Sequence, residues 1–420
     1  MKLHLFGKRE RKISFGLDIG TEAVKLIIFL NEPLEKDKEN NKNKLVALSA
    51  SLQYFDRYGV FDGKDLENDI IRKAISKAVD EAQKNLFLSS EIPRDVKEKV
   101  AKQKKWQVLL NLSADKLKGR IVPQKFIRKN PKGKIFQNEE KTIYQEILKK
   151  AQNEIGQTFA KEIGMLPQDL YWASLRILER KIDGYSVSFL QGYTGQNLEF
   201  KILTTFLPKY YLENIKGLIK NLGMKISKIV HPVENLPILC QGVKKDAIFF
   251  DIGGEVTQFF VVENGNLETI NEIESGGKMF TEILSRELGI DEESARILKE
   301  RYSDKNVNIE TAKKIREMFA SAQQQWFLDL KAKIEKIAKK EFFLSNVYLF
   351  GGGSLLPEIK EILEEKMAVG LNEALFFKPY EIKFLYPNDL KNIENLAKNF
   401  KNPQSIPSLL ICYSPIENYL

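Results

Sequence analysis

FGLDIGTEAVKLIIF at residues 15–29 is matched, 233 residues further along the chain, by AIFFDIGGEVTQFFVV at residues 247–262. In each copy an apolar run reaches an aspartate, glycine and threonine follow, and a second apolar run begins. This pattern predicts two β-hairpins that turn at their glycines. Because glycine lacks a Cβ, the backbone N–H groups beside it can approach an oxyanion closely. Two such hairpins in one chain predict a two-lobed clamp around a nucleotide.

The two aspartates occupy equivalent places in the two hairpins. Asp18 corresponds to Asp251, and Gly20 corresponds to Gly253. An aspartate that faces a polyphosphate has only a metal ion or water to bind. The pairing therefore predicts Mg²⁺ held mostly through its water ligands, with one carboxylate from each lobe.

A third glycine motif, NVYLFGGGSLLPEIKEIL at residues 346–363, predicts a strand, a glycine loop and the start of a helix. The glycine loop would meet a nucleotide at the helix N-terminus. Each motif alone is a weak signal, because such turns are common in ordinary loops. Their order and spacing resemble those of the superfamily that contains actin, the sugar kinases and the heat-shock chaperone ATPases.

Within that superfamily the chain most resembles the bacterial cell-division protein FtsA and its relative PilM of type IV pilus assembly. GGKMFTEILSRELGIDEESARILKERY (residues 276–302) resembles their segment near the ribose. IDGYSV (182–187) and GYTGQNLEFKILTTFLP (192–208) resemble parts of their inserted SHS2 domain. The resemblance implies an α/β actin-like ATPase fold, in which two lobes of duplicated ribonuclease-H-like sheet carry an SHS2 insert.

The resemblance also implies a division into domains. The first lobe covers residues 1–119, the SHS2-like insert covers 120–208, and the chain returns to the first lobe over 209–244. The second lobe covers 245–386, with a helical subdomain at about 278–345 and an adenosine loop at 351–354. Residues 387–420 form a closing segment that packs on the first lobe.

The resemblance assigns a set of residues to ATP and Mg²⁺. The hairpin residues face the phosphates, Lys25 is the phosphate cation unless it is only a surface lysine at a strand edge, and the later residues enclose the ribose and adenine. The set comprises Asp18, Gly20, Thr21, Lys25, Asp251, Gly253, Gly254, Thr257, Gly276, Gly277, Lys299, Gly351, Gly352, Gly353 and Ser354.

Two departures from the family pattern concern hydrolysis. Arg296 stands three residues before Lys299, where the family has an acidic residue that contacts the ribose. His231 precedes Pro232, where the family often has a glutamate that orients the attacking water. His231, or Glu234 nearby, is the candidate catalytic residue, although a core or surface histidine without a catalytic role is the simpler interpretation. We therefore expect at most a slow ATPase.

The composition agrees with a cytoplasmic, multi-lobed protein. The chain has 420 residues, is 43% hydrophobic and carries a net charge of +9. Its lysines are spread among 57 acidic residues without aromatic interleaving, so we expect no nucleic-acid partner. Cys240 and Cys412 lie in apolar surroundings and indicate buried thiols in a reducing compartment. No apolar run approaches the length of a membrane span.

Three functions remain open at this point. The favoured one is an FtsA-like division adaptor that binds the tubulin homologue FtsZ, although the ending IPSLLICYSPIENYL (406–420) lacks the family's basic amphipathic helix. The alternative is a PilM-like component that binds a cytoplasmic peptide of an inner-membrane pilus protein. The third is a small-molecule kinase, for which Asp246 is the candidate base.

Two further contacts are predicted. Residues 1–12 combine apolar and basic side chains that fit an anionic membrane surface, unless they are only a frayed terminus. The protein would then lie at the inner face of the cell membrane. Head-to-tail self-association into filaments is a second expectation, because such contacts need not close.

Overall fold

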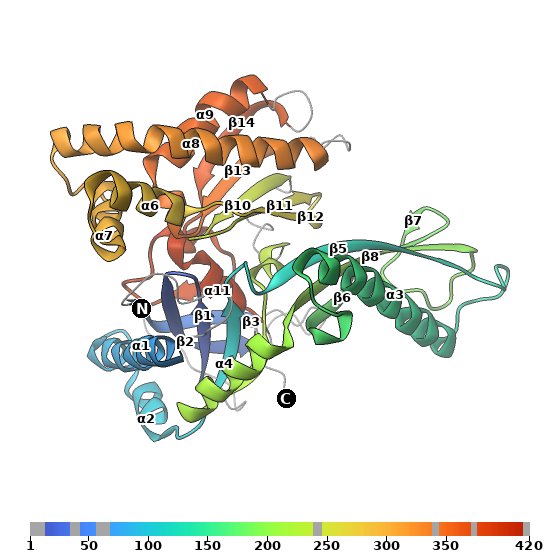
Figure 1. Ribbon diagram of the computed structural model, residues 1–420. Coiled ribbons are helices and arrows are strands. Elements are labelled where there is room, and N and C mark those ends of the chain that lie inside the picture. The colour runs from blue at the N-terminus through green and yellow to red at the C-terminus, as the bar shows by residue number, and fades with distance from the viewer. Residues whose placement is uncertain are drawn as a thin grey trace.

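The structure is a computed structural model, and it describes residues 13–33, 43–55, 68–237, 246–337, 344–370 and 376–414. Two lobes lie one above the other, and a third unit projects from their side (Figure 1). The predicted membrane contact at residues 1–12 and the predicted thiol of Cys240 lie outside the described residues. Cys412 is a buried free cysteine, and burial raises the pKa of its thiol well above the ordinary value.

The first lobe is a six-stranded sheet in the order β15-β3-β2-β1-β4-β9. Helices α1 and α4 pack on one face, and α11 packs on the other against β1, β2 and β4. Because both faces are covered, every residue of β1 is buried. The strands are β1 (Ile13–Ile19), β2 (Ala23–Pro33), β3 (Asn43–Tyr54), β4 (Trp106–Leu112), β9 (Met224–Ile229) and β15 (Ile393–Asn395), and the helices are α1 (Asn68–Leu88), α2 (Arg94–Lys102), α4 (Lys209–Asn221) and α11 (Ile406–Cys412).

The second lobe repeats the central arrangement of the first. β10 pairs antiparallel with β11 and parallel with β13, as β1 pairs with β2 and β4. Its sheet has the order β12-β11-β10-β13-β14. Its elements are β10 (Ala247–Ile252), β11 (Thr257–Glu263), β12 (Asn266–Ile273), α6 (Gly277–Leu288), α7 (Glu292–Ser303), α8 (Ile309–Ile337), β13 (Leu344–Phe350), α9 (Pro357–Gly370) and β14 (Phe376–Phe384).

The projecting unit is inserted between β4 and α4 of the first lobe. It is a four-stranded sheet in the order β5-β8-β6-β7, with helix α3 packed against it over a separate core. Its elements are β5 (Lys118–Ile127), α3 (Gln137–Ile163), β6 (Leu170–Ile182), β7 (Tyr185–Ser186) and β8 (Asn197–Pro208). Short 3-10 turns complete the fold: η1 (Pro167–Asp169), η2 (Pro232–Glu234), η3 (Gly352–Leu355), η4 (Pro387–Asp389) and η5 (Pro403–Ser405).

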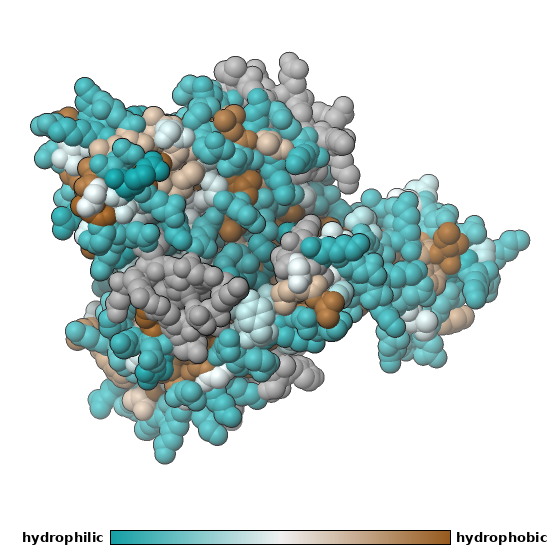
Figure 2. Space-filling view, viewed as in Figure 1, coloured by the Kyte–Doolittle hydropathy of each residue, from teal (hydrophilic) through white to brown (hydrophobic). Residues whose placement is uncertain are grey.

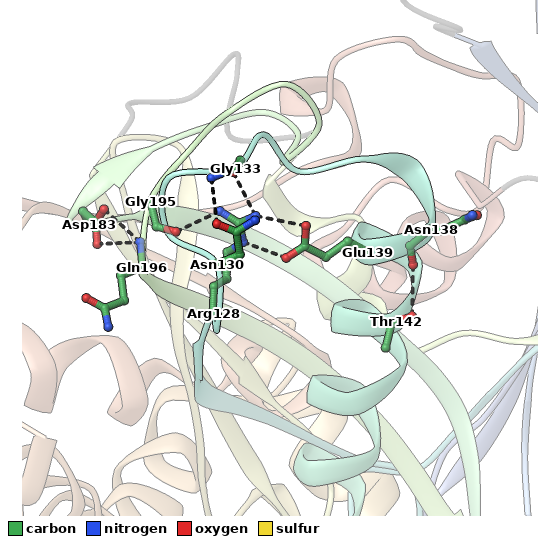
Figure 3. A network of polar contacts seen from close by, with 9 residues as sticks. All are labelled: Arg128, Asn130, Gly133, Asn138, Glu139, Thr142, Asp183, Gly195 and Gln196. Carbon is green, nitrogen blue, oxygen red and sulfur yellow. Dashed lines mark hydrogen bonds and ion pairs between the residues drawn. The ribbon is translucent and has the colours of Figure 1, made fainter.

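A buried arginine holds the far end of the insert together (Figure 3). Arg128 forms a two-pronged ion pair with Glu139 and donates to the carbonyls of Gly195 at 2.9 Å and Gly133 at 3.0 Å. Asp183, which has a φ of 47°, accepts hydrogen bonds from the backbone beside Gly195. The Asp-Gly pair and the glycine segment that suggested an SHS2 domain therefore form turns in this structure.

The visible surface is mostly polar, because the lobes and the insert bury their apolar residues in their own cores. Figure 2 shows a mostly hydrophilic face on which apolar residues are scattered. Among the described residues no helix is both long enough and apolar enough to cross a membrane.

Candidate functional site

A cavity of about 350 Å³ lies between the two lobes. Both predicted hairpin turns line it, together with α7, the glycine loop at η3 and the segment at η5. Its volume is in the range of small-molecule sites. The predicted residues that line it are Asp18, Gly20, Thr21, Lys25, His231, Asp251, Gly253, Gly254, Gly277, Lys299, Gly351, Gly352 and Gly353.

The first hairpin presents an aspartate that already has several partners. Asp18 is 3% exposed and accepts hydrogen bonds from Asn111 Nδ2 at 2.8 Å and from Ser408 Oγ at 2.8 Å. Lys25 Nζ lies 3.4 Å from Asp18 Oδ2, the oxygen that also accepts from Ser408. The register of the sheet explains this, because Lys25 and Asn111 are the residues paired with Asp18 on the two neighbouring strands.

The second hairpin presents an aspartate in a different state. Within the described part of the chain, no hydrogen bond or ion pair to the Asp251 carboxyl group is found, although its backbone belongs to the sheet. Burial raises the pKa of Asp251 to about 7, attraction by Lys25 opposes this, and repulsion by Asp18 adds to it. A Cβ at Gly351 would lie 2.4 Å from Asp251 Oδ1, and Gly351 has a φ of 86°, so only glycine fits there. Asp251 is thus a carboxylate without a counter-charge of its own.

Close backbone packing explains the other glycines of the second hairpin. The carbonyls of Gly253 and Gly254 accept hydrogen bonds from the first backbone N–H groups of α6, at 2.9 and 2.8 Å. A Cβ at Gly276 would lie 2.5 Å from the Gly254 oxygen. A Cβ at Gly254 would lie 2.4 Å from Thr21 Oγ1, so the two hairpins approach each other across the cavity.

Three predicted ligands do not line this cavity. Thr257 is fully buried, where its hydroxyl donates to the Ser275 carbonyl at 2.7 Å and accepts from Trp326 Nε1 at 3.0 Å. The Ser354 hydroxyl donates to the Gly351 carbonyl at 2.7 Å. Gly276 lines a neighbouring cavity instead. The structure thus gives Thr257 and Ser354 contacts inside the second lobe.

Lys299 and Arg296, both on α7, connect the second lobe to the first. Lys299 Nζ lies 3.5 Å from Glu22 of the first hairpin and donates to the Gly277 carbonyl at 3.0 Å. Arg296 stacks on Tyr54 of the first lobe, with 4.1 Å between its guanidinium carbon and the ring centroid. Burial raises the pKa of Tyr54 well above its ordinary value.

An acidic residue does line this part of the cavity, although not at the place predicted from the family pattern. Glu300 is a lining residue and pairs with Arg296 at 2.9 Å. The family pattern places its acidic residue three positions before Lys299, so Glu300, directly after Lys299, was not predicted.

The two candidate catalytic residues differ in position. His231 lines the cavity, and its Nδ1 accepts a hydrogen bond from the Val233 backbone at 3.2 Å. Burial lowers the pKa of His231 to about 3, with a smaller opposing contribution from Glu272. Glu234 is not among the lining residues; its carboxylate accepts from the His231 backbone at 3.1 Å and lies 3.8 Å from Lys228. Burial raises the pKa of Glu234.

Comparison with known proteins supports the fold. No protein-family model matches the sequence, and no curated protein matches it either. A solved structure of the PilM-PilN type IV pilus biogenesis complex superposes with a TM-score of 0.65, at 14% identity, over 97% of this chain and 100% of that chain. EutJ, an ethanolamine utilization protein from Carboxydothermus hydrogenoformans, superposes with a TM-score of 0.45 at 13% identity, over 97% of this chain and 91% of that one.

The duplicated lobes and the likeness to PilM define the class of protein. The chain has the mixed α/β actin-like ATPase fold, as predicted, and carries an inserted domain in its first lobe. Similarity at this level of identity establishes the fold alone.

Proposed function

We propose that this protein binds ATP with Mg²⁺ between its lobes and uses the bound nucleotide to control a partner peptide, in the manner of a PilM-like pilus assembly component. The observation that supports nucleotide binding is the meeting of two glycine hairpins in one cavity. Asp18, Lys25 and Asp251 converge there, beside backbone that only glycine can form.

The residues present fit a magnesium nucleotide. The Asp251 carboxyl has no hydrogen-bond or ion-pair partner among the described residues, and burial raises its pKa, so a bound cation would stabilise its ionised form. Mg²⁺ prefers oxygen ligands and retains several waters, so Asp251 and Asp18 would hold it largely through water. When bound, the ion neutralises phosphate charge. Lys25, which lines the same cavity, would add a second positive charge for the phosphates.

We expect hydrolysis to be slow. A general base works best when its pKa lies near the operating pH. The imidazole of His231, with a pKa of about 3, stays neutral and is a weak base. It can orient a water molecule but removes a proton poorly. Glu234, which is held by the backbone of His231, does not reach the cavity.

A second cavity provides a site for the peptide. It measures about 700 Å³ and lies between the insert and the second lobe. Apolar side chains from both sides, among them Phe159, Met165 and Met279, line it together with charged residues of both signs. A short amphipathic peptide fits such a surface. The solved PilM structure is a complex with PilN, so we propose that the partner here is a cytoplasmic peptide of an inner-membrane pilus protein.

A division role is the second candidate, with FtsZ as the partner. It depends on the resemblance of the insert to the SHS2 domain of FtsA, and its support is weaker because a structure of the PilM-PilN complex superposes over 97% of this chain with a TM-score of 0.65. A kinase has no support from the geometry. The Asp246 carboxylate accepts from the Asn264 backbone at 2.6 Å and is not a lining residue of the cavity.

Two titrations test this proposal. Calorimetry with ATP, with and without Mg²⁺, measures nucleotide binding. Fluorescence polarisation of the ATP-loaded protein then compares the cytoplasmic peptide of the organism's own pilus membrane protein with the C-terminal peptide of its FtsZ. We expect saturable binding of the pilus peptide only. Saturable binding of the FtsZ peptide alone would replace the pilus role with the division role.

A further inference from the structure

The insert is joined to the second lobe by ion pairs on a single strand, β12. Lys118 Nζ and Arg120 Nη2, both on β5, lie 2.8 and 3.0 Å from Glu272 Oε1. Lys201, on β8, lies 2.6 Å from Glu268. The insert is therefore part of the first lobe by chain connection and bound to the second lobe by these charges. If the lobes move relative to each other, the distances in these ion pairs must change.

One of the two clusters continues into the nucleotide cavity. Gln258 Nε2 lies 3.5 Å from Glu272 Oε2 and 3.4 Å from His231 Nε2. Gln258 and His231 line the cavity between the lobes, whereas Glu272 lines the second cavity. Glu268 shows no comparable link toward Gln258 among the described residues. The polar contacts thus run from the insert, through Glu272, to the nucleotide cavity.

The charges around Glu272 keep its carboxyl group ionised and hold it in place. Burial raises the pKa of the Glu272 carboxyl, but Arg120 and Lys118 together bring it below its ordinary value, so the group is ionised at neutral pH. Lys118 is itself buried. Removing the charge of Glu272 would leave two cations without their partner, which is costly in a partly buried site. The carboxylate also fixes the amide of Gln258, which is 3% exposed.

From these contacts we infer that Glu272 is a positioning residue that couples the nucleotide cavity to the inserted domain. Its Oε1 holds the insert on the second lobe, and its Oε2 holds Gln258 beside His231 at the wall of the cavity. This inference rests on the proposed binding of ATP. A nucleotide that draws the lobes together tightens the contact between β5 and β12, and a tighter contact in turn favours the nucleotide, because coupling between sites is reciprocal.

The test compares Glu272→Gln with Glu268→Gln as a matched control. Both substitutions remove one carboxylate charge from β12, but Glu272→Gln takes the partner from two cations of the insert, Lys118 and Arg120, whereas Glu268→Gln takes it from Lys201 alone. Only the first replaces the carboxylate that faces Gln258. Calorimetry measures the ATP affinity in the presence of Mg²⁺, and hydrogen exchange of β5 and β12 measures the protection that ATP produces. We expect Glu272→Gln to weaken ATP binding about fivefold or more and to remove the ATP-dependent protection of β5. Glu268→Gln should keep both.

A second variant guards against loss of folding. Gln258→Leu leaves every ion pair in place and cuts only the link between Glu272 and the cavity. We expect it to remain folded and to lose the ATP-dependent protection of β5. Equal behaviour of Glu272→Gln and Glu268→Gln, or full protection in Gln258→Leu, would overturn the inference. Failure of the wild-type protein to bind ATP would instead contradict the proposed function.

Discussion

The two phosphate hairpins have the same sequence pattern but different surroundings. Asp18 accepts from Asn111 and Ser408 and pairs with Lys25, so its charge is stabilised by the protein alone. Asp251 has no such partner in the described structure, and its pKa is raised to about 7. The first carboxylate has its partners within the protein, whereas under the proposed function the second would face a cation that arrives with the nucleotide. The two copies of the motif therefore differ. Asp18 carries what we call the fixed charge, because the protein itself stabilises it. Asp251 carries the conditional charge, because its ionised form lacks a partner among the described residues.

The largest expected effect comes from removing the conditional charge. In the folded protein the pKa of Asp251 is about 7 against an ordinary value of 3.8, so this group lowers the free energy of unfolding as the pH rises from about 4 to 7, and the loss is complete above pH 7. Asp251→Asn should therefore stabilise the ligand-free protein at pH 8, by at most about 4 kcal/mol, and have little effect at pH 4. Urea unfolding at both pH values measures this. The same stability change at both pH values would contradict the account.

Removing the fixed charge of Asp18 should lower the free energy of unfolding, whereas removing the charge of Asp251 should raise it. Asp18→Asn takes an ionic acceptor away from Lys25 and replaces one carboxylate oxygen with a donor that faces Ser408. We expect a loss of about 3 kcal/mol, because a partly buried cation loses its partner. In urea unfolding the loss should be smaller at pH 8 than at pH 6, because the substitution also removes the repulsion that raises the pKa of Asp251. A neutral or stabilising effect would show that the two aspartates do not differ as described.

The contact beside Asp251 can be tested through Gly351. An alanine there would have a φ of 86° and a Cβ 2.4 Å from Asp251 Oδ1, whereas at Gly265 it would have a φ of 77° and open space. Gly265→Ala is therefore the control for backbone strain alone, at about 1 kcal/mol. We expect Gly351→Ala to cost about 1 to 2 kcal/mol more in thermal or urea unfolding. Equal losses of stability for the two substitutions would show that the close approach to Asp251 has no effect on stability.

The smallest effect concerns one hydrogen bond to Asp18. Ser408→Ala removes the donor on α11 and leaves Asn111 and Lys25 in place. We expect a loss of about 1 kcal/mol, typical of a buried hydrogen bond. In Asp18→Asn, the same substitution should cost less, because the carboxylate that accepts the bond is already gone. A double-mutant cycle measures the difference, and strict additivity would exclude the interaction.

The fold and the centre of the site could be predicted because both depend on local pattern. Alternating apolar strands around Asp-x-Gly turns indicated both hairpins, and the actin-like α/β fold is confirmed. The partners of Asp18 could not be predicted, since Asn111 and Ser408 are 93 and 390 residues away in the chain. The alternation of side chains along β11 could have predicted one further residue of the site. On β11 Thr257 points into the core, and its polar neighbour Gln258, which was not proposed, lines the cavity.

The central claim is that the lobes bind a magnesium nucleotide through one fixed and one conditional carboxylate. The most direct measurement is a calorimetric titration of ATP into the wild-type protein and into Asp251→Asn, each with Mg²⁺ and with EDTA. The account predicts that Mg²⁺ strengthens ATP binding to the wild-type protein by more than about tenfold, and that this gain disappears in Asp251→Asn. Absence of ATP binding to the folded wild-type protein, or an equal gain from Mg²⁺ in both proteins, would contradict it.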